Sequence, residues 1–230
     1  MEDKTDTGEI NLFLPSGELA QRVGETSKWE GRLSELVEAR VANFGRPIDW
    51  THTKAVVNWA TILGHLEDLG PQEREAVKAA AWIHDVGYDF SQAKDAALSR
   101  DAVKAQKKSH ATEGVKLASQ WYNQEEVLRE NFDQNSWNQV LTLVEQHDDL
   151  DKIESGEYGS KLLQILLAAD TLGALDLRAG VVPSFSREDL RKYLAGGVTR
   201  RLRLMKSDKG RQAAIVLVNQ YLERLSRSEG

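Results

Sequence analysis

The residues AAAWIHDVGY, at positions 79–88, place a histidine and an aspartate at the end of an apolar run. Five uncharged residues precede His84 and Asp85, so the pattern predicts a buried helix that ends near Gly87. A carboxylate in the last helical turn opposes the helix macrodipole, whose C-terminal end is already negative. Burial adds a desolvation cost unless a positive group is near. A bound cation would offset both costs, and so would a buried Arg or Lys.

A second carboxylate stands in an equally apolar setting at Asp170. It ends the run LLQILLAAD, and helical spacing puts it on the face that carries Leu163, Leu166 and Leu167. We expect a carboxylate on that face to be buried. A buried carboxylate is normally paired with a cation or bound to a metal.

The five histidines of the chain are the other candidate ligands. They are His52, His65, His84, His110 and His147. His110 begins one amphipathic segment and His147 ends another. A lone helical histidine is usually structural, and His65 fits that description because it lies about 220° around the helix from His52.

Helical periodicity extends over most of the chain and predicts an all-α fold. The expected helices cover about 27–44, 49–69, 71–87, 109–122, 136–147, 160–175, 186–205 and 209–225, with Ser27, Asp49, Ser109 and Ser186 among the N-caps. Residues 88–108 are polar and broken, and we expect a loop with one short helix. Residues 1–26 are predicted to be a loosely ordered lead-in, followed by a single-domain helical bundle over 27–230.

The composition of the chain limits which residues could bind a metal. The chain has 230 residues, a formal net charge of −6 and no cysteine, so any metal must be held by His and carboxylates. No apolar run approaches the roughly 18 residues of a spanning helix, and no secretory signal is evident, so we expect a cytoplasmic protein without a membrane partner. Residues 186–211 hold nine basic and three acidic residues. We interpret this segment as a solvated face, with a patch for a phosphate-rich ligand as the alternative.

The candidate ligands occur in the order His52, His84-Asp85, His110, His147 and Asp170. This order resembles the HD-domain superfamily of metal-dependent phosphohydrolases, whose helical core holds a metal with an H…HD…D set. The surrounding sequence agrees, with DWTHTKAV at 49–56 and ADTLGALD at 169–176. The resemblance covers about 49–179, which implies a metal-site core there and further helices at about 186–225.

The resemblance also implies a ligand set. His52, His84, Asp85 and Asp170 would bind one ion. The additional histidines indicate the branch with two metals, in which His110 and His147 would bind the second ion and Asp85 would bridge. Ligation by N and O alone suits Fe, Mn, Zn, Co or Ni. Asp85 is then the expected catalytic residue, because it alone would touch both ions.

Two adjacent ions can polarise a phosphoryl oxygen and lower the pKa of a shared water. The implied reaction is hydrolysis of a small phosphorylated metabolite or nucleotide, and we expect no nucleic-acid partner. No GxSxG, Walker or GxGxxG motif indicates another chemistry. The candidates for binding substrate phosphate are Arg178, Lys104, Lys107 and Lys108. We expect Asp148 and Asp149 to be exposed, although one could orient a ligand histidine.

Two alternatives remain open at the level of sequence. A small set of HD-type proteins uses a mixed-valent di-iron pair to activate O₂ and cleave a C–H or C–P bond, and it shares the six-ligand pattern. A non-catalytic helical protein with a structural metal or a regulatory nucleotide is the other. The phosphodiesterases that cleave cyclic dinucleotides are disfavoured, because HDVGY lacks their Lys after the doublet and no GYP element follows.

Overall fold

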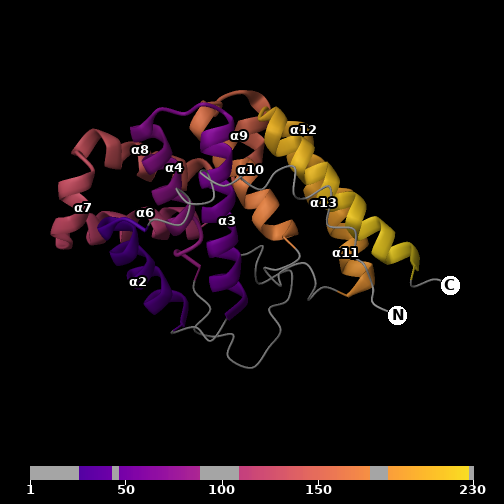
Figure 1. Cartoon of the computed structure of the whole chain (residues 1–230), viewed down its shortest axis with the longest axis horizontal. Helices are drawn as coiled ribbons and strands as arrows, with labels where there is room; N and C mark the ends of the chain where they lie inside the picture. The colour runs from indigo at the N-terminus through magenta and orange to yellow at the C-terminus, as the bar shows by residue number, and fades with distance from the viewer. Residues whose placement is uncertain (1–25, 43–46, 89–108, 177–185, 228–230) are drawn as a thin grey trace.

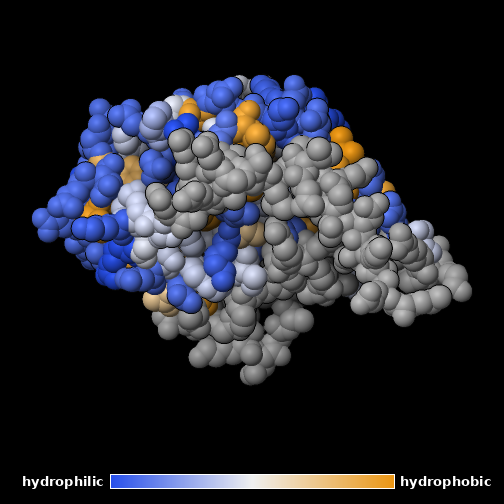
Figure 2. Space-filling view, viewed as in Figure 1, coloured by the Kyte–Doolittle hydropathy of each residue, from blue (hydrophilic) through white to orange (hydrophobic). Residues whose placement is uncertain are grey.

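The computed structural model describes residues 26–42, 47–88, 109–176 and 186–227 (Figure 1). Within these ranges the regular elements are helices, and no strand is present. The prediction of an all-α fold is confirmed. On the face shown in Figure 2, most of the coloured surface is hydrophilic and the apolar residues form small patches. No helix in the described ranges is long and apolar enough to cross a membrane.

The helices follow one another closely along the chain. They are α2 (Lys28–Ala42), α3 (Pro47–Leu66), α4 (Pro71–Ile83), α6 (His110–Gln124), α7 (Glu126–Asn131), α8 (Gln134–Gln146), α9 (Leu150–Ser155), α10 (Lys161–Leu175), α11 (Arg187–Tyr193), the π-helical turn η3 (Leu194–Val198), α12 (Thr199–Leu204) and α13 (Asp208–Arg227). The short helices α7 and α9 were not predicted. The expected lead-in over 1–26 and the loop over 88–108 lie outside the described residues, except for Thr26 and Tyr88.

Several predicted boundaries are wrong for identifiable reasons. Helix α3 begins at Pro47 instead of being capped by Asp49, since proline suits the first helical turn, where its missing N–H is not needed. Helix α8 is capped by Asp133, whose carboxylate accepts a 2.7 Å hydrogen bond from the backbone N–H of Ser136. Helix α10 is capped by Ser160, whose hydroxyl accepts a hydrogen bond from the Leu163 N–H.

The helix predicted near the C-terminus is not one continuous α-helix. The helix predicted over 186–205 is capped by Ser186 as expected, but the π-helical turn η3 divides it into α11 and α12. A π-helical turn changes which residues share a face of the helix. The periodicity before it therefore does not predict which side chains after it point inward.

Helix α10 is the centre of the bundle. Its residues Leu162–Leu175 are all buried, as expected for a helix that is hydrophobic all round. It packs against α3 and α4 on one side and against α13 on the other, and α4 packs in turn on α8. In Figure 1, α3 and α10 lie side by side in the middle of the molecule.

Helices α3 and α10 approach so closely because α10 carries a glycine at the contact. A Cβ atom on Gly173 would lie 2.5 Å from Val56 Cγ2 and 3.0 Å from the Val56 backbone nitrogen. The contact is one turn from His52 on α3 and one turn from Asp170 on α10. Glycine at this position therefore lets these two side chains share one site.

We expect Gly173→Ala to lower the free energy of unfolding by about 1–3 kcal/mol, because the added methyl group meets backbone that cannot move aside easily. Gly31→Ala in α2 is the matched control. Nothing lies within 4 Å of a Cβ there, so it should stabilise the helix by up to about 1 kcal/mol. Denaturant unfolding measures both, and equal stability of the two variants would contradict the packing argument.

Candidate metal centre

Helices from different parts of the chain bring the six predicted ligands together. His52 lies in α3 and Asp170 in α10. The doublet His84-Asp85 lies in the turn just after α4, so the predicted helix over 71–87 ends earlier than expected, at Ile83. The other two candidates are His110, the first residue of α6, and His147, the C-cap of α8.

The six residues form two groups of three, within each of which the potential ligand atoms all lie within 4.8 Å of one another. The first subset consists of His52, His84 and Asp170, and the second of Asp85, His110 and His147. Five of the six side chains are buried, whereas that of Asp85 is 30% exposed. The group is thus closed on most sides and open at Asp85.

Asp85 lies between the two subsets and turns one oxygen to each. Its Oδ2 is 3.2 Å from His84 Nε2 and 3.7 Å from His52 Nε2. Its Oδ1 is 3.6 Å from His147 Nε2 and 3.8 Å from His110 Nε2. Ligand atoms that share one ion at about 2.0–2.2 Å stand roughly 3–4 Å apart, so these distances suit an ion on each side of Asp85.

Backbone carbonyls fix the orientation of two of the imidazoles. His84 Nδ1 is 2.8 Å from the Ala81 carbonyl oxygen, and His147 Nδ1 is 2.7 Å from that of Val144. A carbonyl only accepts, so each Nδ1 carries the proton and the lone pair of each neutral ring is on Nε2, which faces the centre. His84 Nε2 is buried and has no hydrogen-bond partner. A metal ion is the partner that fits this atom.

The charges of the centre are coupled. Burial lowers the pKa of His84, but the carboxylates of Asp85 and Asp170 outweigh it and raise that pKa to about 9. Burial raises the pKa of both carboxyl groups, and their neighbours outweigh it. For Asp85 these are the charge of His84 and the hydrogen bonds from His147 and His84, and for Asp170 the charge of Arg201 and the hydrogen bond from His52. The pKa values of both carboxyl groups lie well below the usual range, so both are ionised at neutral pH.

Arg201 is a site residue that the sequence reasoning missed. Its Nη1 donates to Asp170 Oδ2 at 2.5 Å and its Nη2 to Asp148 Oδ1 at 2.7 Å. The side chains of Arg201 and Asp148 are 12% and 8% exposed, so the expectation of an exposed Asp148 is wrong. Asp149, by contrast, caps α9. The interpretation of 186–211 as a solvated face suits the more exposed Arg203, and it fails for Arg201.

Tyr88 is a second residue without a signal in the sequence. Its ring stacks on that of His110, with centroids 4.1 Å apart and an angle of 8° between the planes. Burial and the nearby carboxylates raise the pKa of Tyr88, so the phenol stays neutral. Stacking of this kind restricts the rotation of the His110 imidazole.

A glycine allows the turn after α4 to reach α6. A Cβ on Gly87 would lie 1.9 Å from the His110 carbonyl oxygen and 2.5 Å from the Gly114 backbone nitrogen. The side of Gly87 that lacks a Cβ therefore lies directly against the backbone of α6. This approach brings His110 beside Asp85.

The remaining candidates lie elsewhere or outside the described residues. His65 belongs to neither subset, as expected. Arg178, Lys104, Lys107 and Lys108 fall in segments outside the described ranges, so their role in binding phosphate stays a prediction.

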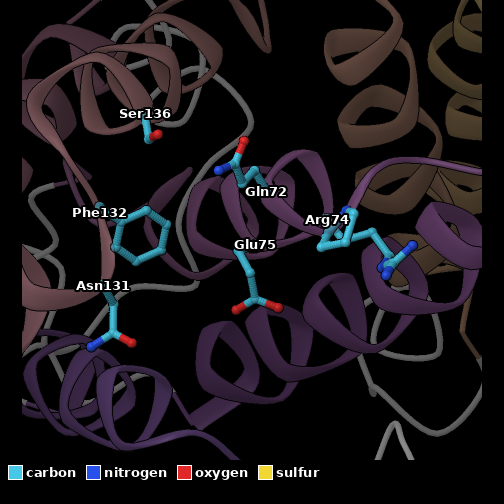
Figure 3. Close-up of a pocket in the computed structure, with 7 residues that line it drawn as sticks. Gln72, Arg74, Glu75, Asn131, Phe132 and Ser136 are labelled. Carbon is cyan, nitrogen blue, oxygen red and sulfur yellow. The ribbon is translucent and has the colours of Figure 1, made fainter.

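A separate pocket lies between the start of α4 and the α7–α8 region (Figure 3). Its charged side chains form hydrogen bonds within the protein: Arg74 donates to the Leu69 carbonyl and Glu75 accepts from Trp29. None of the six candidate ligands lines it.

Comparison with known families agrees with this geometry. Residues 49–175, more than half of the chain, match the family model described as HD domain. The match begins just before His52 and ends just after Asp170, so it encloses all six candidate ligands. No curated protein and no solved structure matches the chain.

The raised pKa of His84 predicts a pH-dependent response to metal. In metal-free protein, the proton on His84 contributes stability that is complete below about pH 6.5 and is lost as the pH rises through about 9. A metal ion must displace that proton, so metal affinity should increase over the same interval. The gain in Tm on adding Mn(II) under argon should therefore grow from pH 6.5 to pH 9. His65→Gln should behave as wild type, and a gain in Tm independent of pH would contradict the argument.

Proposed function

Because the chain belongs to the HD-domain family, whose members are mostly metal-dependent hydrolases, we propose that it is a phosphohydrolase with a two-metal centre. The observation that carries this proposal is the position of Asp85. Its two oxygens face different imidazole pairs at 3.2–3.8 Å. A carboxylate placed in this way is suited to bridge two ions.

The proposed ligands divide as the two subsets do. His52, His84 and Asp170 would hold one ion, and His110 and His147 the other, with Asp85 common to both. When bound, such a pair polarises a phosphoryl group and lowers the pKa of a water that it shares. Fe, Mn, Zn, Co and Ni all suit this set of nitrogen and oxygen donors.

The protein's own residues decide from where a substrate reaches the centre. Five ligand side chains are buried, so access is from the side of Asp85, which is partly exposed. Tyr88 stacks on His110 in the second subset and is a neutral phenol, because burial raises its pKa. Arg201 is already bonded to two carboxylates, which leaves it unsuited to grip a phosphate.

We propose a small phosphorylated metabolite or nucleotide as the substrate. Its phosphate needs cationic partners, and the candidates are those of the sequence. Lys104, Lys107 and Lys108 stand just before His110 in the chain, and Arg178 stands eight positions after Asp170. Both segments are therefore connected directly to elements that carry proposed ligands.

The proposal treats residues 27–230 as one HD-type domain preceded by a lead-in over 1–26. Its metal-site core would span about 49–179, with the helices at about 186–225 packed on it. The contacts of α10 with α3 and α4 on one side, and with α12 and α13 on the other, support this division.

Metal content gives the first test. Protein isolated from cells should carry close to two transition-metal ions per chain, and the double variant His110→Ala/His147→Ala should carry about one. His65→Ala should keep the wild-type content, because His65 lies in neither subset. Elemental analysis measures this directly. Folded wild-type protein that takes up no transition metal, even on reconstitution, would overturn the proposal.

The second test is turnover. Mn-loaded protein under anaerobic conditions should release phosphate or pyrophosphate from members of a panel of nucleotides and phosphomonoesters. Asp85→Asn should lower kcat/KM by orders of magnitude, because it removes the charge that faces both subsets. Asp170→Asn should disturb one ion only, and His65→Ala should change little.

Other outcomes of the same assay would support one of the two alternative functions. Activity that requires iron and consumes O₂ would replace hydrolysis by a di-iron oxidation. Metal uptake without turnover in either form would indicate a non-catalytic metal protein. Full activity of Asp85→Asn would contradict both enzymatic mechanisms.

A further inference from the structure

We propose that Arg201 is a positioning residue for the metal centre, which holds Asp170 so that a single carboxylate oxygen is available to the first subset. The inference rests on the proposed function, since it concerns the ligands of that centre. Arg201 lies on α12, outside the segment 49–175 that matches the family model. The metal centre would therefore depend on a residue of the C-terminal helices, which lie outside the matched segment.

The geometry at Asp170 separates its two oxygens. Oδ1 faces the imidazoles, 3.3 Å from His52 Nε2 and 3.8 Å from His84 Nε2. Oδ2 accepts a hydrogen bond from Arg201 Nη1 at 2.5 Å. While that bond is made, Asp170 offers only Oδ1 to an ion. Without it, the carboxylate is free to rotate and to bind through both oxygens.

The same guanidinium also reaches the second subset indirectly. Nη2 of Arg201 donates to Asp148, which directly follows His147 in the chain. The two bonds use the planar fork of the arginine, whose nitrogens are fixed relative to each other. A lysine would bring the same charge as a single point and would not hold both carboxylates in one plane.

The neighbouring arginines show that this role belongs to Arg201 and not to the basic helix in general. Arg200 pairs with Asp151 and Glu154 of α9, and Arg203 pairs with Glu154; these two arginine side chains are 34% and 66% exposed. Exposed pairs of this kind contribute little. Arg201 is 12% exposed and its partners are 12% and 8% exposed, so its charge is the one that water does not screen.

The experiment measures metal binding directly. Chelator-treated, full-length wild type, Arg201→Lys and Arg203→Lys are titrated with Co(II) chloride against a competing chelator, and the visible absorption bands of Co(II) are recorded. Arg201→Lys should weaken binding of one Co(II) by about 10–100-fold and change its absorption bands, as expected when a group that orients a ligand is altered. Arg203→Lys should match wild type in both readouts.

Asp148→Asn is the second variant, which keeps the bond between Arg201 and Asp170 but loosens the other half of the fork. It should shift affinity in the same direction by a smaller factor, and it decides the question if Arg201→Lys does not fold. A purely structural role for Arg201 would lower Tm and leave the affinity and the Co(II) spectrum of the folded protein unchanged. That result overturns the inference while wild type still binds two ions. Failure of wild type to bind Co(II) would instead overturn the proposed function.

Discussion

The meeting of three carboxylates at one point of a helical core is the constraint on which this structure depends. The side chains of Asp148 and Asp170 are 8% and 12% exposed and that of Asp85 is 30% exposed, and a charge withdrawn from water is costly unless it is paired. Arg201 pairs with Asp148 and Asp170, while imidazoles surround Asp85. Helices distant in the sequence must therefore meet at one point, which explains why α3, α10 and the ends of α4, α6 and α8 converge there.

Close packing provides that convergence. Gly173 allows α10 to lie against Val56 of α3, and Gly87 allows the turn after α4 to touch the start of α6. Each contact serves one subset, since the first brings His52 to Asp170 and the second brings His110 to Asp85. The apolar helix α10 holds its single carboxylate, Asp170, within the core. The geometry of the centre is thus set by backbone contacts that no polar residue could provide.

Much of this arrangement could be predicted from the sequence, for a physical reason. Helical periodicity indicates which residues are buried. A carboxylate within an apolar run, such as Asp170, is therefore recognised from the sequence as a buried charge that needs a partner. Arg201 gives no such signal. It stands 31 positions from Asp170, its neighbours are exposed arginines, and a π-helical turn precedes it. Asp148 and Tyr88 likewise acquire their roles only through contacts between distant segments.

The sequence left two ways to offset the charge of Asp85: a bound cation or a buried Arg or Lys. The structure contains the second solution, and it serves another carboxylate. Asp170 has the arginine. In the described part of the chain, the ionic partners of Asp85 are the imidazoles of His52, His84, His110 and His147. Two of these rings are held by carbonyls with their Nε2 lone pairs toward the carboxylate, an arrangement that repels unless a proton or a metal lies between. A single proton on His84 relieves one side of Asp85 only, whereas an ion in each subset relieves both. The proposed ion in each subset would therefore offset the charge of Asp85 from both sides.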